Sequence, residues 1–174
     1  MEEAIKTASS TAMPCAWANA QAYLLNELVS RQLISSGELE RCADLQQESG
    51  VPLAIMLVRL GLIADTDMAT MLHEACDLPL LDKNNLPQVP LHHSHLSRKF
   101  LQDSFILPLE ETDNELVVAM ADPLDAFSRQ VLELACQKRL HIYVGSLTQI
   151  ENAIEKIYGE GNSKFDDIVD AINI

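Results

Sequence analysis

The chain has 174 residues, of which 48% are hydrophobic and 22% are charged, so its composition excludes wholesale disorder and fits one or two small globular domains. A formal net charge of −14, with the basic residues scattered, excludes a nucleic-acid-binding surface. The longest apolar runs, Val51–Val58 and Leu116–Ala121, are far shorter than the roughly 20 residues of a membrane span, so we expect no direct membrane insertion.

The first part of the chain predicts a flexible leader, residues 1–16, followed by a helical domain, residues 17–81. Apolar residues recur at three- and four-residue steps from Trp17, as in an amphipathic helix. Ser35 or Ser36 would cap a second helix, and Asp65 would cap a fourth helix after a third that starts near residue 52. Four helices in so short a segment indicate a helical bundle.

An internal repeat lies within this bundle. The segment Leu28–Ser36 aligns with Leu57–Asp65 at a constant offset of 29 residues. Each copy reads as a helix end, an apolar corner and the start of a capped helix. We interpret this as a duplicated helix-turn-helix unit, the alternative being two helical hairpins that merely share packing rules.

The second part predicts a linker, residues 82–92, a small α/β domain, residues 93–159, and an acidic linker or tail, residues 160–174. The expected strands and helices of the α/β domain are Ser94–Asp103 (helix), Phe105–Glu110 and Glu115–Met120 (strands), a helix from Asp125 with apolar positions Phe127, Val131, Leu134 and Ala135, His141–Val144 (strand), and a helix capped by Ser146. The predicted fold class is α+β. It combines an N-terminal helical bundle containing the duplicated helix-turn-helix unit with a small three-stranded sheet and two covering helices, in the order β-β-α-β-α.

Few residues are arranged for catalysis, and no glycine pattern of the kinds that bind nucleotides or hold a nucleophile is present in the sequence. His92, His93 and His95 could bind a divalent metal with Cys76 or Asp82, but their spacing in a loop favours solvated histidines. We predict no catalytic, cofactor-binding or metal-binding residue in this chain.

Other candidate groups have simpler explanations. His73 and Cys76 share one predicted helix face, where packing is favoured over metal ligation. Asp122 and Asp125 resemble an acid pair, but a turn and a helix cap explain them better. The cysteines form no CxxC pair and lie beside no basic cluster, which favours reduced core thiols in a cytoplasmic protein; they are Cys15, Cys42, Cys76 and Cys136.

Surface residues remain as candidates for partner binding. Arg59 and Leu60 precede an apolar corner, and Arg98 and Phe100 combine a basic and an apolar group on an otherwise acidic chain. Protein interfaces often have this mixture. We predict these four residues as partner contacts, the alternative being ordinary solvated side chains.

Several segments in order resemble the amino-terminal region of type II secretion and type IV pilus assembly ATPases. The residues that carry the resemblance, over about residues 20 to 160, are Leu62–Asp65, Leu78–Leu81, Phe105–Leu109, Val117–Asp125 and Ile150–Gly159. The Ala-Met-Ala-Asp-Pro-Leu-Asp run within them is the most characteristic. Because the family's nucleotide motifs follow in a separate catalytic portion, the chain resembles a non-enzymatic fragment.

The resemblance implies a function in docking. The complete protein would be a hexameric ATPase that holds ATP and Mg in its catalytic part, with no cofactor in this chain. It would be cytoplasmic and peripheral to the bacterial inner membrane, recruited by the cytoplasmic domain of the type II secretion L component. This region would also contact its own ATPase domain and neighbouring subunits of the hexamer.

A sister branch of the family uses a tandem repeat to bind cyclic di-GMP, with an Arg-Leu-Gly run in each copy. The matching positions here are Tyr23–Leu25 and Pro52–Ala54, and both lack the Arg and the Gly. An arginine to pair with phosphate and a glycine to allow close approach are what such a site needs. We therefore do not expect cyclic di-GMP to bind, and a cyclic di-GMP-sensing regulatory domain is the alternative function.

Overall fold

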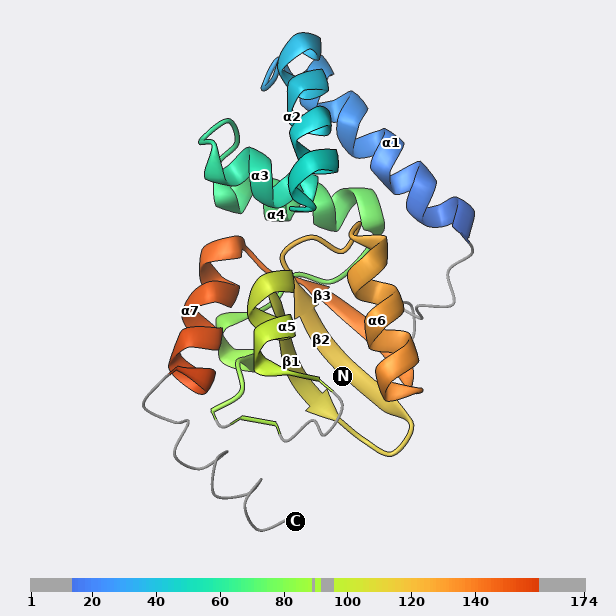
Figure 1. The fold of residues 1–174 in the computed structure, drawn as a ribbon, viewed down its shortest axis with the longest axis vertical. Coiled ribbons are helices and arrows are strands. Elements are labelled where there is room, and N and C mark those ends of the chain that lie inside the picture. Colours follow the sequence, from blue (N-terminus) through green and yellow to red (C-terminus); the bar gives the residue numbers. More distant parts are fainter. Residues whose placement is uncertain (1–13, 89, 92–95, 160–174) are drawn as a thin grey trace.

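The computed structural model describes residues 14–88, 90–91 and 96–159 (Figure 1). The predicted leader and tail thus lie almost entirely outside the described residues. The elements in chain order are α1 (Pro14–Ser30), α2 (Ser36–Ser49), α3 (Leu53–Arg59), α4 (Asp65–Cys76), the 3₁₀ turn η2 (Lys83–Asn85), α5 (Arg98–Ser104), β1 (Ile106–Glu111), β2 (Glu115–Met120), α6 (Ala126–Cys136), β3 (Arg139–Val144) and α7 (Leu147–Tyr158).

The three strands form one mixed sheet in the order β1-β2-β3. Strands β1 and β2 are an antiparallel hairpin, whereas β3 runs parallel to β2 after the α6 crossover, as a parallel pair requires. Leu80 adds an isolated parallel bridge to Val144 at the free side of β3. The segment just before the predicted linker therefore joins the sheet, and the domain limits stay a prediction.

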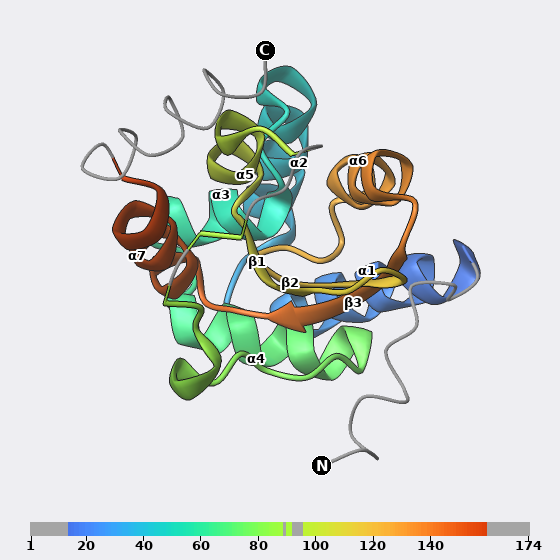
Figure 2. The same cartoon turned by 90° about the horizontal axis from the view of Figure 1, so that it is seen from below.

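The helical part (α1–α4) and the sheet part (β1–β3 with α5–α7) share one core. Figure 1 shows α1–α4 stacked on the end of the sheet, and Figure 2 shows α5 and α6 on the same side of it. A continuous cluster of buried apolar side chains runs from Leu24 in α1 to Tyr158 in α7. The predicted α+β fold, a helical repeat followed by β-β-α-β-α, is confirmed.

The duplication is visible in the backbone. Gln32 and Gly61, 29 residues apart, both have positive φ, at 55° and 71°. The carbonyls of Leu28 and Leu57 accept hydrogen bonds from the N–H groups five residues later, at 3.1 and 3.0 Å. These left-handed helix ends turn the chain at equivalent corners in both copies.

Most predicted helix starts are correct, and two are wrong. Helix α5 begins at Arg98 and not at Ser94, because the side chain of Ser97 caps it by accepting from the N–H of Phe100. The side chains of Ser35, Asp125 and Ser146 cap α2, α6 and α7. Asp65 does not cap α4, whose N-cap is Ala64 without a side-chain hydrogen bond. Because α7 begins beside α4, the Asp65 carboxylate instead accepts from the first N–H groups of α7, at 2.6 and 3.0 Å.

Candidate functional site

A cleft of about 270 Å³ lies where the helical part meets the sheet part. The repeat contributes to one wall residues of α1, α2 and the start of α3: Leu24, Leu25, Gln46, Pro52, Leu53 and Ala54. The β2–α6 connection and the first turn of α6 form the other wall with Asp122, Leu124, Asp125, Ala126 and Phe127. Positions from both degenerate Arg-Leu-Gly runs thus converge on a single cleft.

Asp122 is the ionisable group at the centre of this junction. Its carboxylate accepts hydrogen bonds from the N–H of Ala54, in the first turn of α3, at 3.2 Å and from the N–H of Leu124 at 2.9 Å. Burial raises the pKa of Asp122 to about 6, although both hydrogen bonds favour its charged form. Asp122 thus caps a helix that is remote in sequence and is not arranged as half of a catalytic acid pair.

Arg129 offsets part of the negative charge of Asp122. Its Nη1 donates to the carbonyl of Pro123, and its guanidinium lies 3.9 Å from the centroid of the Trp17 ring. Burial lowers the pKa of Arg129, with nearby carboxylates acting in the opposite direction. Arg129 therefore ties α1 to the β2–α6 connection, and among the described residues that line the cleft none is Arg or Lys.

The chemistry of the cleft follows from these groups. Its walls carry apolar side chains, amides at Gln21 and Gln46 and the carboxylates of Asp122 and Asp125. Asp125 is engaged in capping α6 through Ser128. A phosphate entering the cleft would meet two carboxylates and no lining cation, so the cleft suits an apolar group better than a dinucleotide.

The four predicted partner contacts lie in two places. Arg59, at the end of α3, is drawn into the junction, because its Nη2 lies 3.0 Å from Glu151 Oε1 and its guanidinium 4.9 Å from the Phe105 ring centroid. Leu60 follows it and is 56% exposed. Arg98 and Phe100 begin α5, where Phe100 packs partly against the core. Their partner-binding role stays a prediction.

The described thiols are poorly suited to chemistry. Burial raises the pKa of Cys76 to about 12, helped by the neighbouring Asp122 carboxylate. Burial also raises the pKa of Cys136, and Cys42 is buried in α2. These cysteines behave as small core residues.

The chain has five histidines, three of which lie close together in the sequence. His92, His93 and His95 lie outside the described residues, and within the described ranges no group of His, Cys, Asp and Glu could hold a metal ion. His73 Nδ1 lies 2.5 Å from the Leu78 carbonyl, where the chain leaves α4. His141, the first residue of the predicted third strand, is buried within β3, with Nε2 3.3 Å from Glu115 Oε1.

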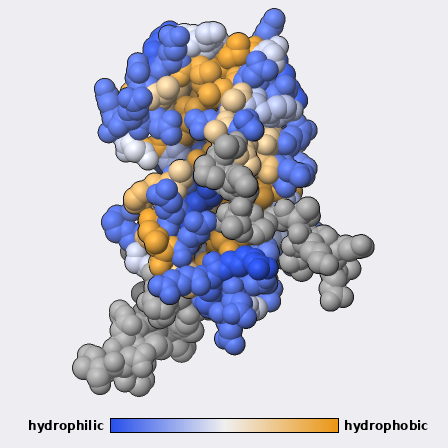
Figure 3. Space-filling model, turned by 90° about the vertical axis from the view of Figure 1, so that its right-hand side faces the viewer, coloured by the Kyte–Doolittle hydropathy of each residue, from blue (hydrophilic) through white to orange (hydrophobic). Residues whose placement is uncertain are grey.

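Sequence reasoning missed the outer face of α6. It grouped Phe127, Val131 and Leu134 as the apolar side of the helix, but Phe127 is 69% exposed and Leu134 is 77% exposed. The buried side chains are instead Ser128, Arg129 and Leu132. Periodicity alone could not choose between these two faces, because both carry apolar residues. Figure 3 views the side on which α1 and α6 lie, and hydrophobic residues gather in several patches on it.

The chain is similar to a known domain family and to two larger bacterial proteins. Residues 76–164 match the MshEN domain. The chain is 33% identical over 156 residues to type II secretion system protein E of Xanthomonas campestris pv. campestris, covering 87% of this chain and 28% of that protein. It is 26% identical over 146 residues to the type IV pilus assembly ATPase PilB of Myxococcus xanthus, covering 83% and 26%. The chain thus spans between a quarter and a third of the length of these relatives.

Solved structures give a consistent result. The N-terminal domain of XpsE superposes with a TM-score of 0.68 at 32% identity, covering 81% of this chain and 97% of that chain. A structure of MshE with c-di-GMP has a TM-score of 0.51 at 21% identity, covering 78% and 98%. None of the helices in the described part of this chain has the length and apolar character needed to cross a membrane.

Proposed function

The chain belongs to the MshEN domain family, and we propose from this premise that it is the docking module of a type II secretion ATPase. It would bind the cytoplasmic domain of the inner-membrane L component and so recruit the motor to the membrane. The observation that carries the proposal is that the chain covers 97% of the N-terminal domain of XpsE at 32% identity. ATP hydrolysis and Mg binding would belong to a catalytic part outside this chain.

The structure supports a binding role over a chemical one. The buried thiol of Cys76 is held neutral, and the carboxylates of Asp65, Asp122 and Asp125 all cap helix starts. The Asp65 and Asp122 caps join the helical part to the sheet part, whereas the Asp125 cap lies within the sheet part. A rigid body of this kind suits recruitment of a larger enzyme.

The direct test is isothermal titration of this chain with the purified cytoplasmic domain of the L component. We expect saturable binding with a stoichiometry near one. Absence of binding by a chain that unfolds cooperatively would contradict the proposal. Mixing the chain with an unrelated acidic protein of similar charge controls for non-specific association.

A second candidate function is regulation by cyclic di-GMP. One observation favours it: the neighbouring MshE structure contains c-di-GMP, which counts against the expectation that this ligand does not bind. The cleft that collects Leu24, Leu25, Pro52, Leu53 and Ala54 is where such a ligand would be sought here. Its two carboxylates and the missing arginines oppose a bound phosphate.

Restoring the Arg-Leu-Gly run in both copies of the repeat tests whether the chain senses cyclic di-GMP. We expect no saturable binding of cyclic di-GMP to the natural chain, and a gain of binding when Tyr23→Arg, Leu25→Gly, Pro52→Arg and Ala54→Gly are combined. Micromolar or tighter binding by the natural chain would instead favour the sensing function. Cyclic di-AMP serves as the control ligand because it carries the same phosphates with a different base.

A further inference from the structure

The outer face of α6 is unusual for this chain. Phe127 and Leu134 are its two most exposed large apolar side chains among the described residues, at 69% and 77%. They lie seven residues apart, so a helical period of 3.6 places them on one line with the half-buried Val131 between them. The resulting stripe, Phe127–Val131–Leu134, is about 10 Å long at 1.5 Å per residue.

The stripe is also poor in charge. The other exposed positions of α6 are Ala126, Gln130 and Glu133, so Glu133 is the only ionisable residue exposed on this helix. The whole chain, by contrast, is 22% charged and has a net charge of −14. Depletion of charge around large apolar side chains distinguishes the centre of a protein interface from ordinary surface.

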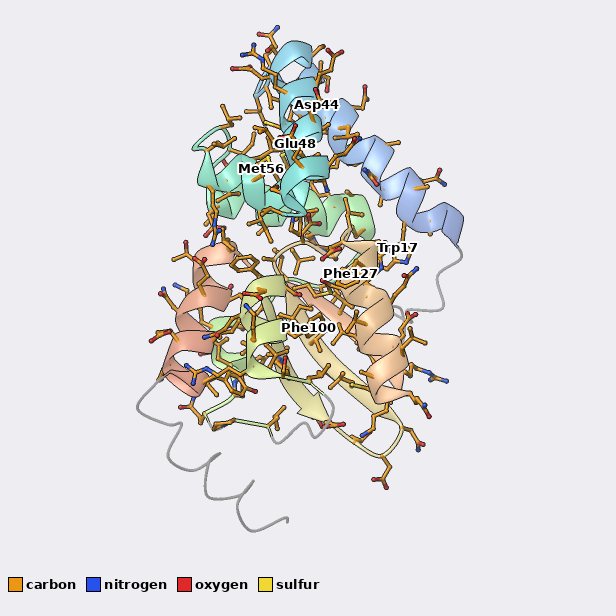
Figure 4. The ribbon with its side chains drawn as sticks, viewed as in Figure 1. Trp17, Asp44, Glu48, Met56, Phe100 and Phe127 are labelled. Atoms are coloured by element: carbon orange, nitrogen blue, oxygen red, sulfur yellow. The ribbon has the colours of Figure 1, made fainter. Side chains whose placement is uncertain are left out.

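The stripe continues into the cleft between α6 and the helical part. Phe127 belongs to both features, and Leu25, Leu53 and Leu124 line the cleft beyond it. Figure 4 places Phe127 at the upper end of α6, where the two parts of the molecule meet, and Phe100 on the separate helix α5. An apolar stripe that ends beside the leucines of the cleft offers an anchor position for an apolar side chain of a partner.

We propose that the outer face of α6, with the adjoining cleft, is the docking surface for an amphipathic helix of the partner. The spacing of the stripe matches the i, i+4, i+7 contacts of helix-on-helix packing. The partner helix would bring an apolar face flanked by Lys or Arg, because the chain has a net charge of −14 and Glu133 borders the stripe. This inference rests on the proposed docking function and assigns it to α6, away from Arg59, Leu60, Arg98 and Phe100.

The test measures binding of the cytoplasmic domain of the L component to six forms of this chain. These are the natural chain, Phe127→Ala, Leu134→Ala, the double variant, Glu133→Lys and Leu45→Ala. Leu45→Ala is the matched control, since Leu45 is an exposed leucine of α2, at 48% exposure, and belongs to none of the predicted contacts. Because Leu134 is more exposed still, its truncation leaves folding intact, which the thermal midpoint verifies.

We expect Leu134→Ala and Phe127→Ala each to weaken binding by about tenfold, and the double variant by more, while Leu45→Ala binds as the natural chain does. Glu133→Lys should weaken binding severalfold, and an unchanged or stronger affinity would overturn the basic character of the partner helix. If the natural chain binds and the α6 variants bind equally well, the surface is wrong while the docking function stands. If the natural chain does not bind at all, the docking function and the α6 surface are both wrong.

Light scattering of the chain alone tests whether a second copy of this chain covers the stripe. We expect a monomer whose mass does not change in Leu134→Ala. A dimer that Leu134→Ala dissociates would mean that a second copy covers the stripe, and this would overturn the assignment to a partner helix.

Discussion

The two copies of the helix-turn-helix unit share a backbone but are held in place differently. In the first copy, Ser35 and Glu38 form a reciprocal capping box at the start of α2, with hydrogen bonds of 2.9 and 3.3 Å. In the second copy, Pro52 and Ala64 supply no side-chain cap to α3 and α4. The cap of α3 comes from Asp122, which lies 68 residues later in the chain.

Burial follows the same division. Helix α2 buries only Cys42, whereas its equivalent in the second copy, α4, buries Met68, Ala69, Met71 and Leu72. The helix start within the first copy is therefore capped locally, and the second copy is capped and buried by the sheet part. A repeated sequence pattern specifies the shape of each copy but not which copy becomes the core of the junction.

The largest expected effect comes from truncating equivalent core leucines. Leu28 and Leu57 occupy the same position in the two copies, and both are fully buried. Each change to alanine should lower the free energy of unfolding by about 3 kcal/mol. By amide hydrogen exchange, Leu57→Ala should also deprotect α7, whereas Leu28→Ala should affect α1 and α2. Identical exchange patterns in the two variants would remove the proposed difference between the copies.

The next effect is the pH dependence that Asp122 contributes. Its pKa in the folded protein, about 6, lies above its ordinary value of 3.8 because the carboxylate is buried. The folded state therefore binds this proton more tightly than the unfolded state, so the contribution is fully present below pH 3.8 and is lost as pH rises through 6. The change amounts to about 3 kcal/mol.

Asp122→Asn provides the comparison, since it keeps an acceptor but does not titrate. Urea unfolding between pH 4.5 and 7.5 should show natural-chain stability falling relative to the Asn variant as pH increases. Parallel profiles would mean that Asp122 is not desolvated by the junction.

A smaller effect tests the cap that Asp65, in the helical part, provides to α7 in the sheet part. Asp65→Ala leaves the N–H groups of Leu147 and Thr148 without their acceptor and should cost about 1.5 kcal/mol. Asp67→Ala removes the same charge from the first turn of α4 and is the matched control. Chemical denaturation of the two variants measures the difference. Equal losses would show that the charge near α4 matters and the bond to α7 does not.

The smallest effect concerns the cap that Ser35 provides to α2. Ser35→Ala should cost about 1 kcal/mol and increase amide exchange only within α2. Ser36→Ala, one residue later, should have little effect. Deprotection that spreads into the sheet part after Ser35→Ala would contradict the local character of the first copy.

Local signals in the sequence were sufficient for much of the fold. The apolar run from Leu116 predicted β2 with its observed bounds, Glu115–Met120, and the serine pair Ser35–Ser36 marked the start of α2. The sequence could not show that Asp65 and Asp122 cap helices in the opposite part, because both bonds depend on how the two parts dock. It also could not show which side of α6 faces solvent, because that helix carries apolar residues on both sides.

The most direct measurement of the central claim is co-sedimentation of the complete secretion ATPase with membrane vesicles that contain the L component. With this domain present, we predict that the ATPase sediments with the vesicles, and that vesicles without the L component leave it in the supernatant. Deleting the domain should leave ATP hydrolysis measurable but abolish sedimentation. An ATPase that still sediments without this domain would contradict its role as the docking module.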